Sequence, residues 1–126
     1  MRSINRITTA TAAVVFGLGV AAPPAAADSV SDFYSGKTLR VIVASSAGGG
    51  YDAYSRVLAK HIVKYIPGKP SSVVQNMPGA GGLRAANFLY NKAPKDGSYI
   101  GHVQRTAPFH QILGRPGALF DPVKFN

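Results

Sequence analysis

The 126-residue chain contains no cysteine, and only five of its residues are acidic. Without cysteine, disulfide bonds, thiolate metal sites and cysteine nucleophiles are all excluded. Five acids provide no evident pair of carboxylates for general acid–base catalysis. A small domain without disulfides depends on its hydrophobic core alone, and at this length the core requires a complete folding unit.

Motifs of several enzyme and cofactor-binding classes are also absent. No G-x-x-x-x-G-K-[ST] segment occurs, so the phosphate-binding lysine and the magnesium-binding hydroxyl of a P-loop are missing. Residues 79–84 begin like a dinucleotide-binding G-x-G-x-x-G segment, but Arg84 stands at its last position. The histidines lack metal-ligand spacing, and we expect surface or packing roles for His61, His102 and His110. The sequence thus predicts a protein that is not an enzyme and uses no metal or cofactor.

The first 27 residues have the layout of a secretory signal peptide. Arg2 and Arg6 give a positively charged start, residues 7–22 are apolar or small, and the alanines at 25–27 supply a cleavage pattern before Asp28. A retained membrane anchor is the alternative, but the run is short and rich in Ala, Thr and Gly, and no later segment could span a bilayer. We expect export to the periplasm, cleavage after residue 27 and no stable membrane insertion afterwards.

The remaining segment, 28–126, is strongly basic. Without Arg2 and Arg6 it keeps 12 of the 14 Lys and Arg residues and all five acids, which gives a formal charge of +7. The charges are scattered, and no three basic residues are consecutive. We therefore expect no nucleic-acid binding, and small anionic metabolites are the more natural partners of an exported protein.

Hydrophobic patterning predicts that strands and helices alternate. Apolar β-branched runs predict strands at 38–44, 72–76 and 98–104. Three- to four-residue periodicity predicts helices at 51–66, 83–91 and 108–113. Residues 28–37 are expected to form a leader, and 114–126 a loop punctuated by proline and glycine. Because strands that alternate with helices imply right-handed crossovers, the predicted fold class is α/β with a parallel βαβαβ sheet.

The helix predicted at 51–66 is amphipathic. Its apolar face consists of Tyr54, Val57, Leu58, Ile62 and Tyr65, and its charged face of Asp52, Arg56, Lys60 and Lys64. Asp52 lies near the first turn and pairs with Arg56 at i,i+4. Pro67 is expected to end the helix.

Two glycine-rich loops form the candidate site. Both emerge from the carboxyl ends of parallel strands, where ligands gather in such sheets. Glycine lets the backbone approach a ligand closely, and free N–H groups at a helix start favour negative charge, so backbone amides could form an anion site. The residues expected to contribute are Ser45, Ser46, Ala47, Gly48, Gly49, Gly50 and Asp52 from the first loop and Pro78, Gly79, Ala80, Gly81 and Gly82 from the second. Tight turns without a ligand are the alternative.

Three segments together resemble a known family: "LRVIVASSAGGGYDAYSRVLAKHI", "VVQNMPGAGGLRAANFLY" and "APKDGSYIG". They are similar to the periplasmic substrate-binding proteins of tripartite tricarboxylate transporters, the Bug family. That family shows a signal peptide, a P-F-x-x-G-G-x-x-D loop, an N-R-P-G-A-G-G loop and a P-D-G turn. The matching positions here are Gly48, Gly49, Asp52, Asn76, residues 78–82, Asp96 and Gly97. The resemblance covers nearly all of residues 28–126, but only the first third of a typical member.

The resemblance implies a partial first lobe of a type II periplasmic binding protein fold. In that fold two α/β lobes close around a small carboxylate-containing ligand, which the protein then delivers to membrane transporter subunits. Residues 28–126 would be an incomplete N-terminal lobe, and without its C-terminal lobe we expect the chain to bind ligand weakly or not at all.

The third predicted strand is followed by Gln104, Arg105 and Thr106, which could also reach the cleft. Arg105 is placed to pair bidentately with a carboxylate, although a surface role fits it equally well. The sequence departs from the family at Ala44 and Ser45, which replace Pro-Phe, and at Met77, which replaces Arg. These departures leave the identity of the ligand open.

Two other functions remain open from the residues alone. A small basic exported module could bind an anionic surface or a partner protein through its +7 charge, and such binding would fall steeply with ionic strength. An esterase-like enzyme that uses Ser45 or Ser46 would need an oriented base, and neither serine has a G-x-S-x-G context.

Overall fold

The structure, a computed structural model, describes residues 27–125, and nearly all of the predicted signal peptide lies outside them. Strands and helices alternate in the order α1 (Ala27–Tyr34), β1 (Thr38–Val43), α2 (Gly50–Ile62), β2 (Ser71–Asn76), α3 (Leu83–Asn91), β3 (Tyr99–His102) and α4 (Ala107–Ile112), with single 3-10 turns η1 (Ala80–Gly82) and η2 (Pro122–Lys124). Within the described residues, no helix combines the length and the apolar character needed to cross a membrane.

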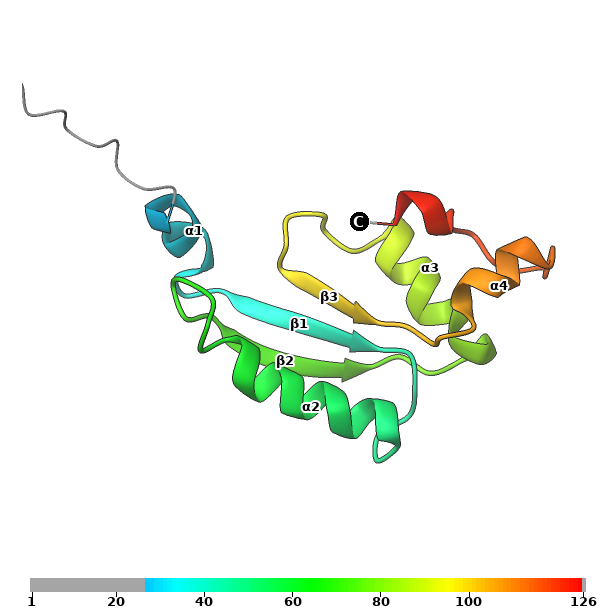
Figure 1. The fold of residues 1–126 in the computed structure, drawn as a ribbon, viewed down its shortest axis with the longest axis horizontal. Helices are drawn as coiled ribbons and strands as arrows, with labels where there is room; N and C mark the ends of the chain where they lie inside the picture. Colours follow the sequence, from blue (N-terminus) through cyan, green and yellow to red (C-terminus); the bar gives the residue numbers. More distant parts are fainter. Residues whose placement is uncertain (1–26, 126) are drawn as a thin grey trace, which may run out of the picture.

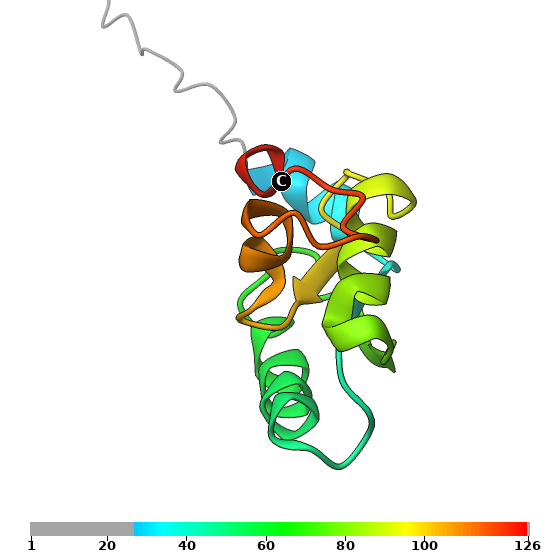
Figure 2. The same cartoon turned by 90° about the vertical axis from the view of Figure 1, so that its right-hand side faces the viewer.

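The three strands form one parallel sheet in the order β2-β1-β3 (Figure 1). Val41 of β1 aligns with Val74 of β2 on one side and with Ile100 of β3 on the other. The chain steps from β1 to one neighbour and then crosses back over β1 to the other. Right-handed crossovers in opposite directions place α2 and α3 on opposite faces of the sheet, and Figure 2 shows the two helices well apart. The predicted α/β class with a parallel sheet is confirmed.

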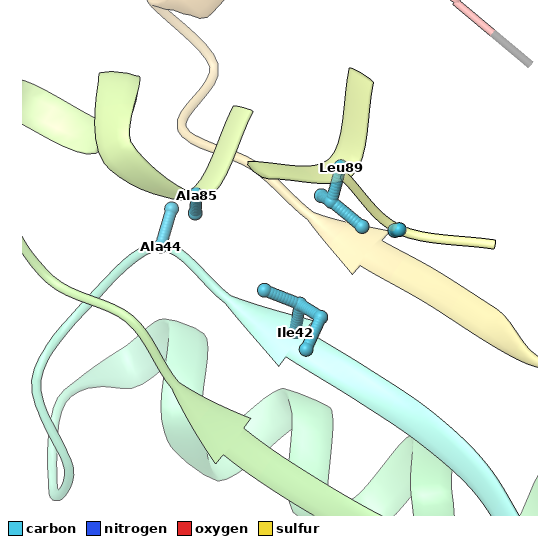
Figure 3. Packing of buried hydrophobic residues seen from close by; sticks show 5 residues of the cluster. Ile42, Ala44, Ala85 and Leu89 are labelled. Atoms are coloured by element: carbon cyan, nitrogen blue, oxygen red, sulfur yellow. The ribbon is translucent and has the colours of Figure 1, made fainter. Parts of the chain in front are cut away.

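The central strand β1 forms the middle of the core because helices cover both of its faces. Val41 is fully buried and packs in a cluster with Ala59 of α2. Ile42 is also fully buried and packs on the other face with Ala85 and Leu89 of α3 (Figure 3). A strand buried on both faces reads as a continuous apolar run, which explains why the sequence located β1 correctly.

The contact between α3 and β3 depends on the absence of a side chain at Gly101. Leu89 of α3 is only 6% exposed. A Cβ atom at Gly101 of β3 would lie 2.4 Å from Cδ1 of Leu89. Glycine weakens a strand in isolation, but it allows another element to approach the backbone closely. Gly101 therefore provides the space into which Leu89 packs.

The predicted leader is in fact the helix α1, and it packs against the base of the sheet. Gly36 follows the helix with a φ of +71°, the left-handed conformation that commonly ends helices. The Tyr34 hydroxyl donates a hydrogen bond of 2.9 Å to the carbonyl of Gly97, in the turn before β3. A Cβ at Gly68 would lie 2.3 Å from the carbonyl oxygen of Ser31, so this turn also closely contacts α1.

Helix α2 ends at Ile62, whereas the prediction extended it to residue 66. Beyond this point the amides of Lys64 and Tyr65 bond to carbonyls only three residues back. A helix continuing through Pro67 would place the proline ring against the carbonyl of Val63. The chain therefore tightens into turns before it reaches the proline.

Strand β3 is also shorter than the predicted 98–104. It pairs only with β1, and the register places its last residue, His102, opposite Val43, where β1 ends. The segment after His102 therefore has no strand to pair with and turns toward α4.

The apolar face predicted for α2 points to solvent instead of packing on the core, as an amphipathic helix usually does. Tyr54 is 76% exposed, Val57 61% and Leu58 43%. The buried face consists of small or polar side chains, Asp52, Ser55 and Ala59. Small side chains let the helix approach the sheet closely, and Asp52 finds hydrogen-bond donors there. Periodicity detects an apolar stripe, but it does not specify which side of the helix meets the sheet.

Because Leu89 occupies the space beside Gly101, the substitution Gly101→Val is expected to lower the free energy of unfolding by about 1–3 kcal/mol. In a Leu89→Ala background the same change should cost at least about 1 kcal/mol less, since the new side chain fills the vacated space. Urea unfolding followed by circular dichroism measures both effects. Gly50→Ala is the matched control, since a Cβ at that position would contact nothing within 4 Å. Additive effects of the two substitutions would contradict this packing.

Candidate functional site

The candidate site lies where the three parallel strands end, at one edge of the sheet (Figure 1). Loops 44–49, 77–82 and 103–106 follow β1, β2 and β3 respectively. They contact one another through Gly82, where an added Cβ would lie 2.4 Å from Cγ of Gln104 and 3.5 Å from Cβ of Ala44. The Gln104 side-chain amide also donates to the carbonyl of Ala44 at 3.4 Å. The strand order reverses between β1 and β3, which makes this edge a topological switch point.

The first glycine loop is held in shape by the carboxylate of Asp52, which is only 4% exposed. One of its oxygens accepts hydrogen bonds from the Gly48 amide at 2.8 Å and from Nε of Arg56 at 3.0 Å. The other accepts from the side-chain amide of Asn76 at 2.9 Å. Both oxygens are therefore engaged within the chain, so Asp52 positions the loop and does not present a free carboxylate.

Asn76 extends this network to the second loop. Its side-chain amide also donates to the carbonyl of Ser45 at 3.0 Å, and its Oδ1 accepts from Arg56 Nη2 at 3.3 Å. Asn76 is the last residue of β2, immediately before the second glycine loop. The side chains of Asp52, Arg56 and Asn76 thus connect both loops to the first turns of α2.

The same contacts determine the charge of Asp52. The Arg56 guanidinium, followed by the Gly48 amide and the Asn76 side chain, stabilises the carboxylate and holds the pKa of Asp52 well below its usual range. The carboxylate in turn raises the pKa of Arg56. The pair therefore remains charged at neutral pH.

The start of α2 presents backbone amides that no side chain covers. Gly49, the residue that caps the helix, has an extended conformation with φ −84° and ψ 171°, and no side chain caps the first turn. The first N–H groups of a helix have no partner within the helix, and they favour an anion at this end. Gly49 and Gly50 are both exposed. An anion can therefore approach these amides without displacing a side chain.

The second glycine loop has an unusual backbone. Ala80, Gly81 and Gly82 have positive φ values of 48°, 62° and 93°. Glycine adopts such φ values easily at positions 81 and 82. At Ala80, by contrast, the left-handed conformation costs about 1–2 kcal/mol. Local strain of this kind clusters at ligand-binding sites. The amide of Met77 bonds to the carbonyl of Val43 at 2.7 Å, which fixes the start of the loop beside the end of β1.

His102, the last residue of β3, joins a small hydrogen-bond network with α2. The hydroxyl of Ser55 lies 2.7 Å from both the carbonyl of Tyr51 and Nδ1 of His102. Since a hydroxyl has one proton, both contacts are hydrogen bonds only if His102 donates from Nδ1. The Tyr51 ring packs against the imidazole, with centroids 4.7 Å apart. Ser55 is completely buried, so this Ser–His pair offers no accessible nucleophile.

Two open pockets lie at this edge of the sheet. One, of about 320 Å³, is lined by Gly50, Tyr51, Tyr54 and His102. The other, of about 420 Å³, is lined by Gly81, Thr106, Phe109, His110, Leu113 and Arg115. Each glycine loop therefore borders one pocket. Among residues 27–125, no group of His, Cys, Asp and Glu side chains is arranged to hold a metal ion.

The structure brings some of the predicted residues to these pockets and gives others different contacts. Gly50, Gly81 and Thr106 line the pockets. Gln104 packs between the loops, and the Arg105 amide donates to the Tyr51 hydroxyl at 3.4 Å. Sequence reasoning did not include Tyr51, His102, His110 and Arg115 among the candidate residues. No local motif marks these four residues. Tyr51 directly follows the first loop in the sequence, whereas His102, His110 and Arg115 lie in segments that only the crossover connections bring to the loops.

A comparison with curated proteins finds a relative whose similarity covers most of this chain. The chain is 36% identical over 113 residues to the UPF0065 protein in gbd 5'region from Cupriavidus necator, which corresponds to 90% of this chain and 32% of the relative. The chain thus spans about a third of the length of that relative. No protein-family model matches the chain, and no solved structure matches it.

Because the folded-state pKa of Asp52 is depressed, its carboxylate stabilises the fold above the unfolded-state pKa of about 4. This contribution is lost as the pH falls through the lower folded-state value. We expect Asp52→Asn to lower the urea midpoint strongly at pH 6, and the difference from wild type to shrink steadily below about pH 4. Urea titrations from pH 6 down to pH 2 test this, with the exposed Asp32→Asn as control. A difference that is independent of pH would contradict the assigned network.

Proposed function

We propose that the chain is the N-terminal part of a periplasmic solute-binding protein of the Bug family. The UPF0065 name of the relative belongs to that family, and the motif resemblance of the two glycine loops agrees with it. The parallel sheet with helices on both faces is compatible with part of one lobe of a type II periplasmic binding protein. Export through the N-terminal signal peptide and the absence of enzymatic activity are parts of the same proposal.

The proposed ligand is a small organic carboxylate, bound at the switch point between β1 and β3. One observation carries this proposal: both glycine loops lie at the same end of the sheet. There Gly82 of the second loop packs closely against Ala44 of the first loop and Gln104. The exposed amides of Gly49 and Gly50 stand at the positive end of α2 and suit a carboxylate oxygen.

The charged side chains of this edge divide into two roles. Asp52 and Arg56 neutralise each other, so the buried carboxylate does not repel an anionic ligand. Arg105 is exposed and has no side-chain partner among residues 27–125. Its guanidinium is available to pair with a ligand carboxylate. Closure by a second lobe and delivery to membrane transporter subunits complete the proposed cycle.

A second candidate function, binding to an anionic surface, is favoured by the solvent face of α2. Tyr54, Val57 and Leu58 are exposed on one side of it. Lys60 and Lys64 lie on the adjacent side, and neither has an ion-pair partner in the described part of the chain. An exposed helix face that is half apolar and half basic is typical of helices that lie in a membrane interface.

The role of the Gly49 amide can be tested by replacing its N–H with the ring nitrogen of proline. The φ of −84° at this position lies close to the range that proline adopts, and alanine also adopts it. We expect Gly49→Pro to weaken succinate binding about tenfold, since a hydrogen bond to a charged group contributes about 1.5–3 kcal/mol. Gly49→Ala keeps the N–H and is expected to bind like wild type. Chemical-shift titrations give the affinities, and equal affinities of the two variants would remove Gly49 from the site.

The surface-binding candidate predicts that Lys60→Gln with Lys64→Gln lowers partitioning onto phosphatidylglycerol vesicles at least tenfold, since each lysine contributes about 1 kcal/mol. The matched control, Lys92→Gln with Lys124→Gln, removes the same charge elsewhere. Co-sedimentation at low and high salt measures both. Equal losses in the two double variants would show that net charge alone, and not α2, determines binding.

A further inference from the structure

Apart from Gly81, the pocket beside the second glycine loop is lined by side chains to which the proposed amide site assigns no role. It has a volume of about 420 Å³ and lies between Gly81 and the segment that contains α4. A Cβ at Gly81 would lie 3.7 Å from both Cε1 and Nε2 of His110, so the imidazole packs directly against the loop. Pockets that bind small molecules start at about 300 Å³.

Three polar side chains around this pocket have no partner among residues 27–125. Nδ1 of His110 is the one buried side-chain nitrogen or oxygen there that lacks a hydrogen bond. The Thr106 hydroxyl does not cap α4, and the guanidinium of Arg115 forms no ion pair or hydrogen bond with any described residue. The amide of Arg115 bonds to the carbonyl of His110 at 2.8 Å, which anchors its backbone beside the imidazole. Thr106 and Arg115 are exposed and can be hydrated, so the buried Nδ1 of His110 is the group whose missing partner needs an explanation.

The buried nitrogen determines which imidazole atom can donate. Orphaned buried N–H groups are rarer than under-satisfied acceptors. A proton on Nδ1 of His110 would be a buried N–H without an acceptor. The neutral tautomer with its proton on Nε2, the atom beside Gly81, avoids this. Nε2–H of His110, the Thr106 hydroxyl and the Arg115 guanidinium then supply donors, and the last is positively charged. This donor set suits a carboxylate.

The other wall of the pocket is apolar. Phe109 is 57% exposed and Leu113 67% exposed. They lie one helical turn apart, with the amide of Leu113 bonded to the carbonyl of Phe109 at 2.9 Å. A carboxylate without an apolar body would leave both side chains in contact with water.

We propose that this pocket selects a carboxylate ligand with an apolar body. The carboxylate contacts the amides of the second glycine loop, Nε2–H of His110 and the guanidinium of Arg115, and the apolar body covers Phe109 and Leu113. The inference rests on the proposed function, because it assigns the ligand class to the same strand-end edge. It adds that residues 106–115, which include α4, discriminate between acids, and that the first glycine loop does not.

The test uses isotope-labelled full-length chain, titrated with benzoate, acetate and succinate and followed by NMR. The His110→Gln variant assigns the His110 imidazole signals by their disappearance. We expect benzoate to shift the His110 imidazole and the Gly81 amide, and to bind about tenfold more tightly than acetate. Phe109→Ala with Leu113→Ala should reduce this preference to less than twofold. Both side chains are largely exposed, so the fold is expected to tolerate their removal.

Arg115→Gln should weaken benzoate and acetate equally, by about tenfold, because a charge-assisted hydrogen bond is lost from both. The matched control Lys92→Gln should change neither affinity more than twofold. Equal affinity for benzoate and acetate in the wild type, or no shift of His110 at saturating benzoate, would overturn the inference. The succinate titration shows whether a negative result concerns only this pocket or also the proposed two-loop site. Succinate shifts at Gly49 and Gly50 would retain the two-loop site, whereas benzoate shifts at His110 without them would retain only the pocket.

Discussion

The arrangement of the strand ends depends on the buried carboxylate of Asp52. Its hydrogen bonds reach the backbone of Gly48, the guanidinium of Arg56 and the side chain of Asn76, so one charge connects three segments. Removing the Asn76 side chain would leave Oδ1 of Asp52 buried without its donor, which is much more costly than losing a surface contact. Because Asn76 also holds the carbonyl of Ser45, the first glycine loop cannot shift independently of β2. A strong local constraint thus makes flexible, glycine-rich segments well defined.

The order of the strands turns this local constraint into a candidate binding site. With β1 in the centre, the helices diverge to opposite faces and the loops after β1 and β3 separate around a switch point. Gly82 has no side chain, and this allows Gln104 and Ala44 to close the space between the loops. The proposed binding of an anion rests on the remaining backbone amides and on the guanidiniums of Arg105 and Arg115, which have no partner among residues 27–125. In the proposed pocket, the apolar side chains beside Arg115 distinguish one class of anion from another.

The sequence predicted the site unevenly, and the reasons are physical. The pair Asp52 and Arg56 was predictable, because an i,i+4 spacing on a helix places two side chains in reach of each other. The contribution of Asn76 was not, because it comes from a strand and meets Asp52 only after β2 pairs with β1. Asp52 was expected to help bind a ligand, but its oxygens are occupied by the chain's own donors. His110 and Arg115 belong to a segment whose position depends on the crossover, and no short motif marks them.

The sequence alone determined the strands, the helices between them and the parallel α/β class. These features follow from apolar runs and turn residues, which act over a few neighbouring positions. Only the tertiary structure decided which face of α2 is buried, and it chose Ser55 and Ala59 over Tyr54 and Val57. The reason is that close approach to the sheet favours small side chains, and Asp52 must reach donors on β2 and the first loop. Contacts of this kind join residues far apart in the chain, so no local pattern encodes them.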